Sequence, residues 1–328
     1  MIFIGILSTA KINHQSILIP VEKRTDCRVI AVASRSPHKA TAYAKLHDIP
    51  TAYGAYQDLL DDPRIAAVYI STPNSLHEFW IQKALQAGKH VLCEKPAFTS
   101  SGMAESLKKF ALSRNLFLME AMHYRYHPAL KDFFALLSER ILGDIHCVKV
   151  TLRYYLPIEG DDIRLNPDLK GGVLKHLGCY CLDVLTTVIQ KPLSFDNINV
   201  VKKTHSVDLE TSGTLISSDG KTRAEFLCDF SGDVFESEIQ VEGENGFMNL
   251  KSGMNPTTFD IEAPKDVWTL ETNLPMKPCL SLGDGKTTYD FQLDAFIESL
   301  KNGRLAPVIN ERASELLVQG GHLVSLQI

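Results

Sequence analysis

Apolar and polar positions follow two different periods along the first 120 residues of the chain. Short apolar runs rich in β-branched residues predict strands, at Ile2–Leu7, Arg28–Ser34, Ala66–Ser71, His90–Cys93 and Leu116–Met119. Between these runs, helical spacing predicts helices that begin at Ser36–Pro37 and span Leu76–Ala87 and Ser101–Ser113. The alternation is typical of βαβ units and predicts an α/β fold, a doubly wound parallel sheet with helices on both faces.

The pattern changes after Met122. Strand-like stretches now follow one another, and turn sequences such as Gly243–Gly246 favour hairpins between them. They lie at Ile145–Leu156, Ile198–Lys203, Ser212–Ser217, Thr222–Asp229 and Glu236–Glu242, with helical patterns at Pro128–Glu139, Gly172–Val188 and Glu311–Leu326. We therefore expect a first domain over 1–122 and a second, α+β domain over 123–328, whose large, mostly antiparallel sheet is covered by helices on one face only.

Length and charge agree with two domains that differ in character. A chain of 328 residues exceeds the roughly 250–300 residues at which a single core stops growing. The net charge of −5 divides unevenly, because residues 1–122 carry 14 basic and 10 acidic side chains and the remainder carries 20 and 29. A mildly basic first part suits an anionic ligand, whereas the acidic remainder argues against a nucleic-acid partner.

Membrane, export and disulfide signals are not evident in the sequence. No apolar stretch approaches the roughly 20 residues of a membrane helix, and the apolar start lacks a basic segment, so we expect a cytoplasmic protein with no membrane partner. The seven cysteines form no Cys-x-x-Cys pair. They predict reduced thiols rather than a disulfide framework or a metal site.

The turns after the first two strands are candidate dinucleotide contacts. After strand one, this fold places Gly-x-Gly-x-x-Gly, and here the glycine positions read Ser8, Ala10 and Asn13. The candidate contacts in this turn are Ser8, Thr9, Ala10, Lys11 and Ile12, although a plain strand–helix turn has the same pattern. After strand two, Ser34 and Arg35 stand where a carboxylate would bind the ribose of NAD. They favour NADP, with NAD possible, unless Arg35 is only a solvated surface charge.

Three further motifs carry a family resemblance. They are Ser71-Thr72-Pro73-Asn74 with His77, Glu94-Lys95-Pro96, and Met119-Glu120-Ala121 followed by Arg125 and Pro128. With them the chain resembles the Gfo/Idh/MocA oxidoreductases from residue 1 to at least Asp183. Its motifs are most similar to the dimeric dihydrodiol dehydrogenase and NADP-linked xylose dehydrogenase branch.

The resemblance implies a Rossmann-type first domain that binds a nicotinamide dinucleotide, and a second domain for substrate binding and oligomerisation. It adds Ser71, Thr72, Pro73, His77, Glu94 and Lys95 to the candidate cofactor contacts, with a cis peptide before Pro96. It also implies a homodimer or a higher homo-oligomer through the open sheet. We expect the strands to have apolar residues on both faces, which would require a second cover.

Proton transfer is assigned to Lys95 and Tyr180, with His176. A lysine at the end of a parallel strand can exchange a proton with a substrate oxygen, although Lys95 can equally be a structural partner of Glu94. His176 stands where the family has Asp, and Tyr180 keeps the family's His or Tyr position; the spacing of four puts both on one helix face. The alternative is that His176 only caps a packed helix and that activity is altered or lost.

Polar residues predict a hydroxylated substrate. His123 stands where the aromatic-diol branch tends to have tryptophan, and His123, Arg125, Arg164 and His176 are the candidate substrate contacts, with no metal. Arg125 can also be a structural ion-pair residue and Arg164 a loop charge. The sequence thus predicts an NADP(H)-dependent oxidoreductase for a sugar, polyol or sugar-derived carbonyl. A non-catalytic dinucleotide sensor is the alternative.

Overall fold

The computed structural model describes residues 1–155, 162–204, 206–231, 235–251, 269–275, 280–281, 285–304 and 308–328. The chain divides into two compact units. The first comprises Met1–Met122 and Tyr289–Ile309, and the second comprises His123–Thr288 and Asn310–Ile328. Each unit is described by itself.

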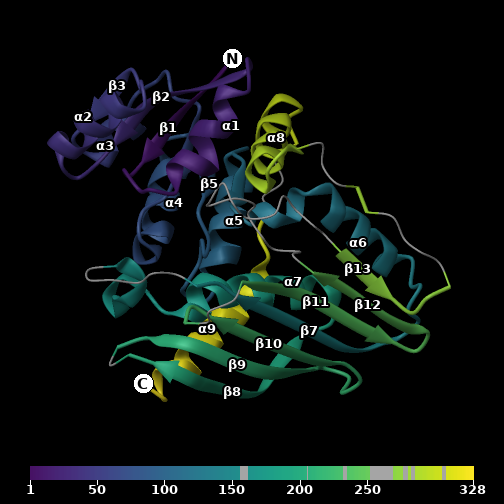
Figure 1. Ribbon diagram of the computed structural model, residues 1–328. Coiled ribbons are helices and arrows are strands. Elements are labelled where there is room, and N and C mark those ends of the chain that lie inside the picture. Colours follow the sequence, from purple (N-terminus) through teal and green to yellow (C-terminus); the bar gives the residue numbers. More distant parts are fainter. Residues whose placement is uncertain are drawn as a thin grey trace. The chain divides into compact units, whose positions relative to one another are not determined.

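The first unit contains a six-stranded parallel sheet in the order β3-β2-β1-β4-β5-β6 (Figure 1). Its strands are β1 (Ile2–Leu7), β2 (Cys27–Ala33), β3 (Thr51–Tyr53), β4 (Ala67–Ile70), β5 (His90–Cys93) and β6 (Leu118–Glu120). This order reverses between β1 and β4, and dinucleotides bind at the carboxyl ends of strands at such a reversal. The five predicted strands are confirmed to within two residues at each end, and the three-residue β3 was not predicted.

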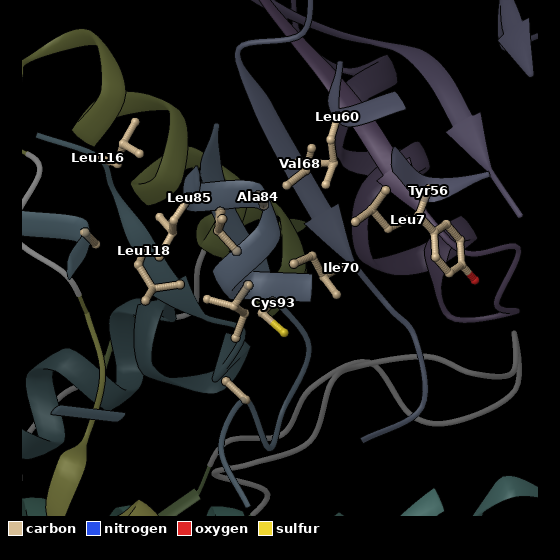
Figure 2. Packing of buried hydrophobic residues seen from close by; sticks show 14 of the residues in the cluster. Leu7, Tyr56, Leu60, Val68, Ile70, Ala84, Leu85, Cys93, Leu116 and Leu118 are labelled. Atoms are coloured by element: carbon tan, nitrogen blue, oxygen red, sulfur yellow. The ribbon is translucent and has the colours of Figure 1, made fainter. Parts of the chain in front are cut away.

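Helices lie on both faces of this sheet. They are η1 (His14–Leu18), α1 (Ile19–Glu22), α2 (Pro37–Leu46), α3 (Tyr56–Leu60), η2 (Asn74–Leu76), α4 (His77–Gln86), α5 (Met103–Ser113) and α8 (Thr288–Lys301). Ser36 is the N-cap of α2, as its side chain accepts the backbone N–H of Lys39. On one face, Leu7, Ile70 and Cys93 pack with side chains of α3, α4 and α5, including Leu85 (Figure 2).

Helix α8 completes the opposite face of the first sheet. Phe296 stacks on Phe117 with ring centroids 5.6 Å apart, and Lys23 pairs with Asp290 at 2.9 Å. Val308, just after this helix, bridges to Met119 beside β6. Residues 289–309 fall in the predicted second domain, but these contacts place them in the first unit. Local sequence patterns could not predict this, because the contacting segments are far apart along the chain.

The second unit contains a seven-stranded sheet in the order β13-β12-β11-β7-β10-β9-β8. Its strands are β7 (Ile145–Arg153), β8 (Leu193–Lys203), β9 (Asp208–Ser217), β10 (Arg223–Asp229), β11 (Glu236–Gly243), β12 (Gly246–Lys251) and β13 (Thr269–Thr272). Among the described strand pairs of this second sheet, only β7–β10 is parallel, so the prediction of a mostly antiparallel sheet is confirmed. The predicted strand end at Leu156 lies outside the described residues.

Helices of the second unit cover one face of this sheet (Figure 1). They are η3 (His123–Tyr126), α6 (Pro128–Ser138), η4 (Ile163–Leu165), η5 (Pro167–Leu169), η6 (Leu174–Gly178), α7 (Cys179–Val188) and α9 (Glu311–Ser325). Two glycines permit close packing, because a Cβ on Gly178 would lie 3.3 Å from the Cys228 sulfur and one on Gly320 would lie 3.0 Å from the Phe195 ring. The predicted helix over 172–188 is a π-helical turn, η6, followed by α7.

The other face of the second sheet is polar over its central strands. Val150 and Phe226 are buried on the packed face. On the opposite face, Lys149 of β7 lies in register between Glu225 of β10 and Gln240 of β11. The expectation of apolar residues on both faces is therefore wrong for these strands. Their alternation is that of a sheet with one face packed and one face hydrated.

Neither a membrane span nor a disulfide is found in the described residues. No described helix is long and apolar enough to cross a membrane. Six cysteines of the described chain are free thiols, and Cys279 lies outside it. Burial raises the pKa of the Cys181 thiol, which keeps this side chain protonated within the core.

Candidate functional site

The turn after β1 is held by buried side chains. Ser8 has a φ of 118°, a conformation that side chains rarely adopt and that suits the first fingerprint glycine. Asn13 donates its amide N–H to the Ser8 carbonyl at 2.9 Å, and the Ser71 hydroxyl donates to Asn13 Oδ1 at 2.5 Å. The Ser8 hydroxyl donates to the Ser71 carbonyl at 2.9 Å. Asn13 was singled out from sequence only as the third glycine position, and the structure shows that its side-chain hydrogen bonds fix the turn.

Free backbone donors remain in the same turn. The Ala10 N–H donates to the Ser8 hydroxyl at 3.0 Å. By contrast, the N–H groups of Thr9, Lys11 and Ile12 have no acceptor within the described part of the chain. Lys11 is exposed, and the turn leads into the π-helical η1. Unsatisfied N–H groups at the start of a helical segment are suited to a phosphate group.

An exposed arginine follows the end of β2, where the sequence predicts a contact with the ribose part of a dinucleotide. Arg35 is exposed, and no carboxylate pairs with it in the described residues. Ser34 is buried, and its hydroxyl accepts the Ser36 N–H at 3.3 Å. Burial raises the pKa of the nearby Tyr56 phenol, and the charge of Arg35 opposes that rise. The guanidinium thus lies beside a phenol and is available to an anion.

His77 connects the loop after β4 to the loop after β5. Its ring nitrogens lie 2.7 Å from the Thr72 carbonyl and 2.8 Å from the Pro96 carbonyl. Burial lowers the pKa of His77, although both carbonyls oppose that effect. The Thr72 hydroxyl is buried with no partner in the described structure. His77 therefore positions two loops, and Thr72 keeps a hydroxyl for a ligand.

The loop after β5 carries the Glu94-Lys95-Pro96 motif. The peptide between Lys95 and Pro96 is cis, as the resemblance implied. Glu94 accepts a short hydrogen bond from the Tyr69 phenol, whose oxygen also lies 2.7 Å from the Ser16 hydroxyl. Burial raises the pKa of Glu94, although the Tyr69 phenol opposes that rise. Lys95 is partly buried at the carboxyl end of the strand.

These features fit a bound dinucleotide. The turn after β1 has three unsatisfied N–H groups, Thr72 has an orphaned hydroxyl, and Arg35 has no carboxylate partner within the described residues. All of them follow strands of one parallel sheet, where such ligands bind. The observation that decides the fit is the set of donors with no protein acceptor.

In the second unit, Tyr180 is hydrogen-bonded to His123. The Tyr180 hydroxyl lies 3.0 Å from His123 Nε2, and His123 Nδ1 lies 2.9 Å from the Thr288 hydroxyl. All three residues are buried, with relative exposures of 6%, 3% and 0%. The Tyr180 ring also packs edge-on against His123 and Tyr124. Sequence reasoning missed Thr288, which is 165 residues away from its partner.

Arg125 pairs with a fully buried carboxylate. Its Nε donates to Asp183 Oδ2 at 2.5 Å and a second guanidinium nitrogen donates to Oδ1, while the Tyr124 phenol donates to Oδ2 at 2.5 Å. Burial lowers the pKa of Arg125, but attraction to Asp183 and Tyr124 and the hydrogen bond to Asp183 together outweigh it, so the pKa is raised. Asn310 completes the set with an amide N–H 2.9 Å from Oδ1. These contacts favour the structural alternative for Arg125.

Arg164 and His176 both lie near Asp162. Arg164 Nε donates to Asp162 at 2.8 Å, and this contact, more than the weaker attraction of His176, lowers the pKa of the Asp162 carboxyl. His176 is half-buried, and its ring centroid lies 6.0 Å from that of Phe230. No signal in the sequence indicated Asp162. His176 and Arg164 thus lie in one neighbourhood, and their contact with a substrate stays a prediction.

The close approach of backbones explains the two glycines before η6. A Cβ on Gly171 would lie 2.5 Å from the Arg164 carbonyl oxygen. Gly172 has a φ of 103°, and a Cβ there would lie 2.1 Å from Asp208 Oδ1. Asp208 in turn accepts the Leu174 N–H at 2.9 Å. Larger residues would displace the start of the helix that carries His176 and Tyr180.

Both parts of the chain match descriptions of one protein family. Residues 3–122 match "Oxidoreductase family, NAD-binding Rossmann fold", and residues 133–249 match "GFO/IDH/MocA C-terminal domain". A trans-1,2-dihydrobenzene-1,2-diol dehydrogenase from Xenopus laevis is 32% identical over 319 residues, which are 95% of this chain and 94% of the relative. The chain belongs to the Gfo/Idh/MocA family.

A second relative and two solved structures extend this result. A D-xylose 1-dehydrogenase (NADP(+)) from Haloferax volcanii is 36% identical over 218 residues, 66% of each chain. A 3-ketoreductase from Actinomadura kijaniata, in complex with TDP-benzene and NADP, has a TM-score of 0.80 at 22% identity, covering 99% and 97% of the two chains. A levoglucosan dehydrogenase in complex with NADH and levoglucosan has a TM-score of 0.78 at 16% identity, covering 99% and 96%. These structures share the fold, and the family makes the chain an NAD(P)-binding oxidoreductase.

Proposed function

We propose that the protein is an NADP(H)-dependent oxidoreductase that transfers a hydride between the nicotinamide and a sugar, a polyol or a sugar-derived carbonyl. The observation that carries the proposal is Lys95, a partly buried lysine at the end of β5, together with the Thr72 hydroxyl after β4, which is buried without a partner in the described part of the chain. Of its relatives, one is a D-xylose dehydrogenase with NADP(+) in its name and another is a dehydrogenase of a cyclic diol.

The coenzyme is assigned to donors of the first unit. The N–H groups of Thr9, Lys11 and Ile12 bind the pyrophosphate, and the Thr72 hydroxyl and Pro73 line the nicotinamide side. Arg35 binds the 2′-phosphate of NADP, with Ser34 beneath it, because a guanidinium forms charge-assisted hydrogen bonds with phosphate. Ser8, Ser71, His77 and Glu94, also candidate contacts, support these loops through the hydrogen bonds described above.

Proton transfer at the substrate oxygen is assigned to Lys95 and Tyr180. When bound, the nicotinamide would supply or accept the hydride at the substrate carbon. The Lys95 ammonium stabilises a developing alkoxide, and the Tyr180 hydroxyl exchanges the proton with the substrate oxygen. His176 orients a substrate hydroxyl in the position where relatives have Asp.

The substrate class follows from polar side chains. His176 lies near Asp162 and is the proposed contact to a substrate hydroxyl, while Arg164, whose guanidinium pairs with Asp162, is withdrawn from direct contact with the substrate. Arg125 is withdrawn from the proposed substrate contacts, because Asp183 occupies its guanidinium. His123 has both ring nitrogens in hydrogen bonds with Tyr180 and Thr288.

The protein is also proposed to be a homo-oligomer through the polar face of the second sheet. In the described second unit, the packed helices and the buried apolar residues share the other face. Lys149, Glu225 and Gln240 would then form polar contacts with a second copy. Light scattering at micromolar concentration tests this part, and a monomer would remove it.

Coenzyme titration and turnover of a lysine variant test the function. Wild-type protein and Lys95→Ala are titrated with NADPH by fluorescence and assayed on aldoses and polyols, with Lys45→Ala as an exposed control on α2. Lys95→Ala should bind NADPH nearly as well as wild type and lose about 10²–10⁴ in kcat. Unimpaired turnover in Lys95→Ala would refute the assignment. NADPH binding without turnover on any of these substrates would favour the sensor alternative.

A further inference from the structure

We infer that His123 is the proton partner of Tyr180, and that the chain Tyr180–His123–Thr288 carries the proton that the reaction releases or consumes. The inference rests on the proposed function, because it gives Tyr180 a role in proton transfer. It changes the role of His123, which the sequence analysis assigned to substrate binding.

The distances in the chain accommodate one tautomer of His123 that serves proton transfer. His123 Nε2 lies 3.0 Å from the Tyr180 hydroxyl, and Nδ1 lies 2.9 Å from the Thr288 hydroxyl. A neutral imidazole has one donor and one acceptor nitrogen, and a threonine hydroxyl can accept. With Nδ1–H donating to Thr288, Nε2 is the acceptor that faces the phenolic proton of Tyr180.

The same arrangement accommodates the protonated ring. When Nε2 gains a proton, it donates to the Tyr180 oxygen, and Nδ1–H still donates to Thr288. No side chain has to rotate between the two states. Burial of all three residues, at exposures of 6%, 3% and 0%, holds the atoms in place and favours hydrogen bonding to one another over hydrogen bonding to water.

The proton balance is simple for alcohol oxidation. The substrate carbon loses a hydride to the oxidised coenzyme that the proposed function requires, and its C–O bond becomes a carbonyl. The hydroxyl proton of the substrate passes to Tyr180 Oη, while the phenolic proton of Tyr180 passes to His123 Nε2. Tyr180 stays neutral and His123 becomes an imidazolium. Carbonyl reduction follows the reverse path.

Packing against Tyr180 is the competing explanation, since the two rings also lie edge-on with centroids 5.6 Å apart. The variant that separates the two roles is His123→Gln, whose amide keeps the polarity and much of the volume but cannot take up a proton. Thr288→Val removes the partner of Nδ1 at nearly constant volume. His146→Gln, an exposed histidine on β7, is the matched control.

Steady-state kinetics give the first readout. In His123→Gln we expect kcat to fall about 10²-fold or more, the lower range for a general acid or base, with both KM values within about threefold. Thr288→Val should lower kcat less, and His146→Gln should match wild type. A wild-type kcat in His123→Gln would overturn the inference. A His123→Gln variant in which KM rises while kcat is unchanged would overturn it as well.

A spectroscopic readout does not depend on turnover. In protein labelled with ¹⁵N-histidine, the ring resonances of His123 are identified by their loss in His123→Gln. Tyr180→Phe removes only a hydroxyl and should shift the Nε2 resonance while Nδ1 stays near its wild-type value. An unchanged Nε2 would overturn the inference even in an active enzyme. A wild-type protein without coenzyme binding or turnover would defeat the proposed function and this inference together, whereas the preceding results defeat the inference alone.

Discussion

The Asp183 carboxylate is fully buried and accepts the Nε–H of Arg125 at 2.5 Å. The pair joins η3 to α7, so the turn that carries His123 is tied to the helix that carries Tyr180. Such a pair contributes little net stability when compared with apolar residues, but loss of one partner leaves an uncompensated charge.

Asp183→Asn should therefore destabilise the protein strongly. We expect the free energy of unfolding to fall by about 3 kcal/mol or more, because the Arg125 guanidinium loses its counter-ion in a buried site. Urea unfolding measures the change. Asp144→Asn is the control, since the Arg140–Asp144 pair is exposed, and it should cost about 1 kcal/mol or less. Equal costs for the two variants would contradict this account of the pair.

Arg35→Asp should reverse the preference between coenzymes. Loss of a guanidinium contact to the 2′-phosphate should weaken NADPH binding about tenfold or more, where tenfold is about 1.4 kcal/mol, and the new carboxylate suits the ribose of NADH. Fluorescence titrations of both coenzymes measure the ratio. Arg28→Asp, an exposed change within β2, is the control. A wild type that binds NADH as tightly as NADPH would remove Arg35 from the site.

Asn13→Ala should weaken coenzyme binding indirectly, because the Asn13 side chain bonds to Ser8 and Ser71 and is not one of the proposed coenzyme contacts. The change removes two buried hydrogen bonds that hold Ser8 at a φ of 118°, so the turn loses the geometry of its N–H groups. We expect a loss of about 1–3 kcal/mol in unfolding free energy and about tenfold in NADPH affinity. Asn199→Ala, at an exposed position of β8, is the control and should change neither measurement.

His127 should make stability depend on acid. Burial lowers its pKa from 6.5 to about 4, while Nδ1 accepts the Ala129 N–H at the start of α6. Between these values the unfolded chain binds more protons than the folded one, so stability falls as the pH drops from 6.5 towards 4. The loss should reach about 3 kcal/mol.

His127→Asn keeps a capping acceptor and removes the titrating group. Unfolding in urea at pH 7 and pH 4.5 should then show a smaller pH dependence than in wild type. His38→Asn, an exposed change on α2, should leave that dependence as it is. An identical pH dependence in His127→Asn and wild type would assign the acid sensitivity to other groups.

Local patterns predicted the central strands of the first unit well. The strands at 2–7 and 90–93 match to the residue, because runs of β-branched side chains that are buried on both sides leave a strong local signal. The short β3 and the helix α3 have too few residues for a periodic pattern. The Ser8 turn was located from sequence spacing, but its dependence on Asn13 required the positions of Ser71 and Asn13 side chains 58 residues apart.

The sequence by itself therefore determined most of the longer strands and helices, the family motifs and the residue types at the candidate site, since periodicity and short motifs are local properties. The tertiary structure decided which contacts these side chains make: Arg125 pairs with Asp183, His77 bridges two loops, and His123 pairs with Tyr180. It also assigned α8 to the first unit. These relations join residues as many as 267 positions apart. They depend on burial and on the geometry of donors and acceptors, and neither is encoded in any short stretch of the chain.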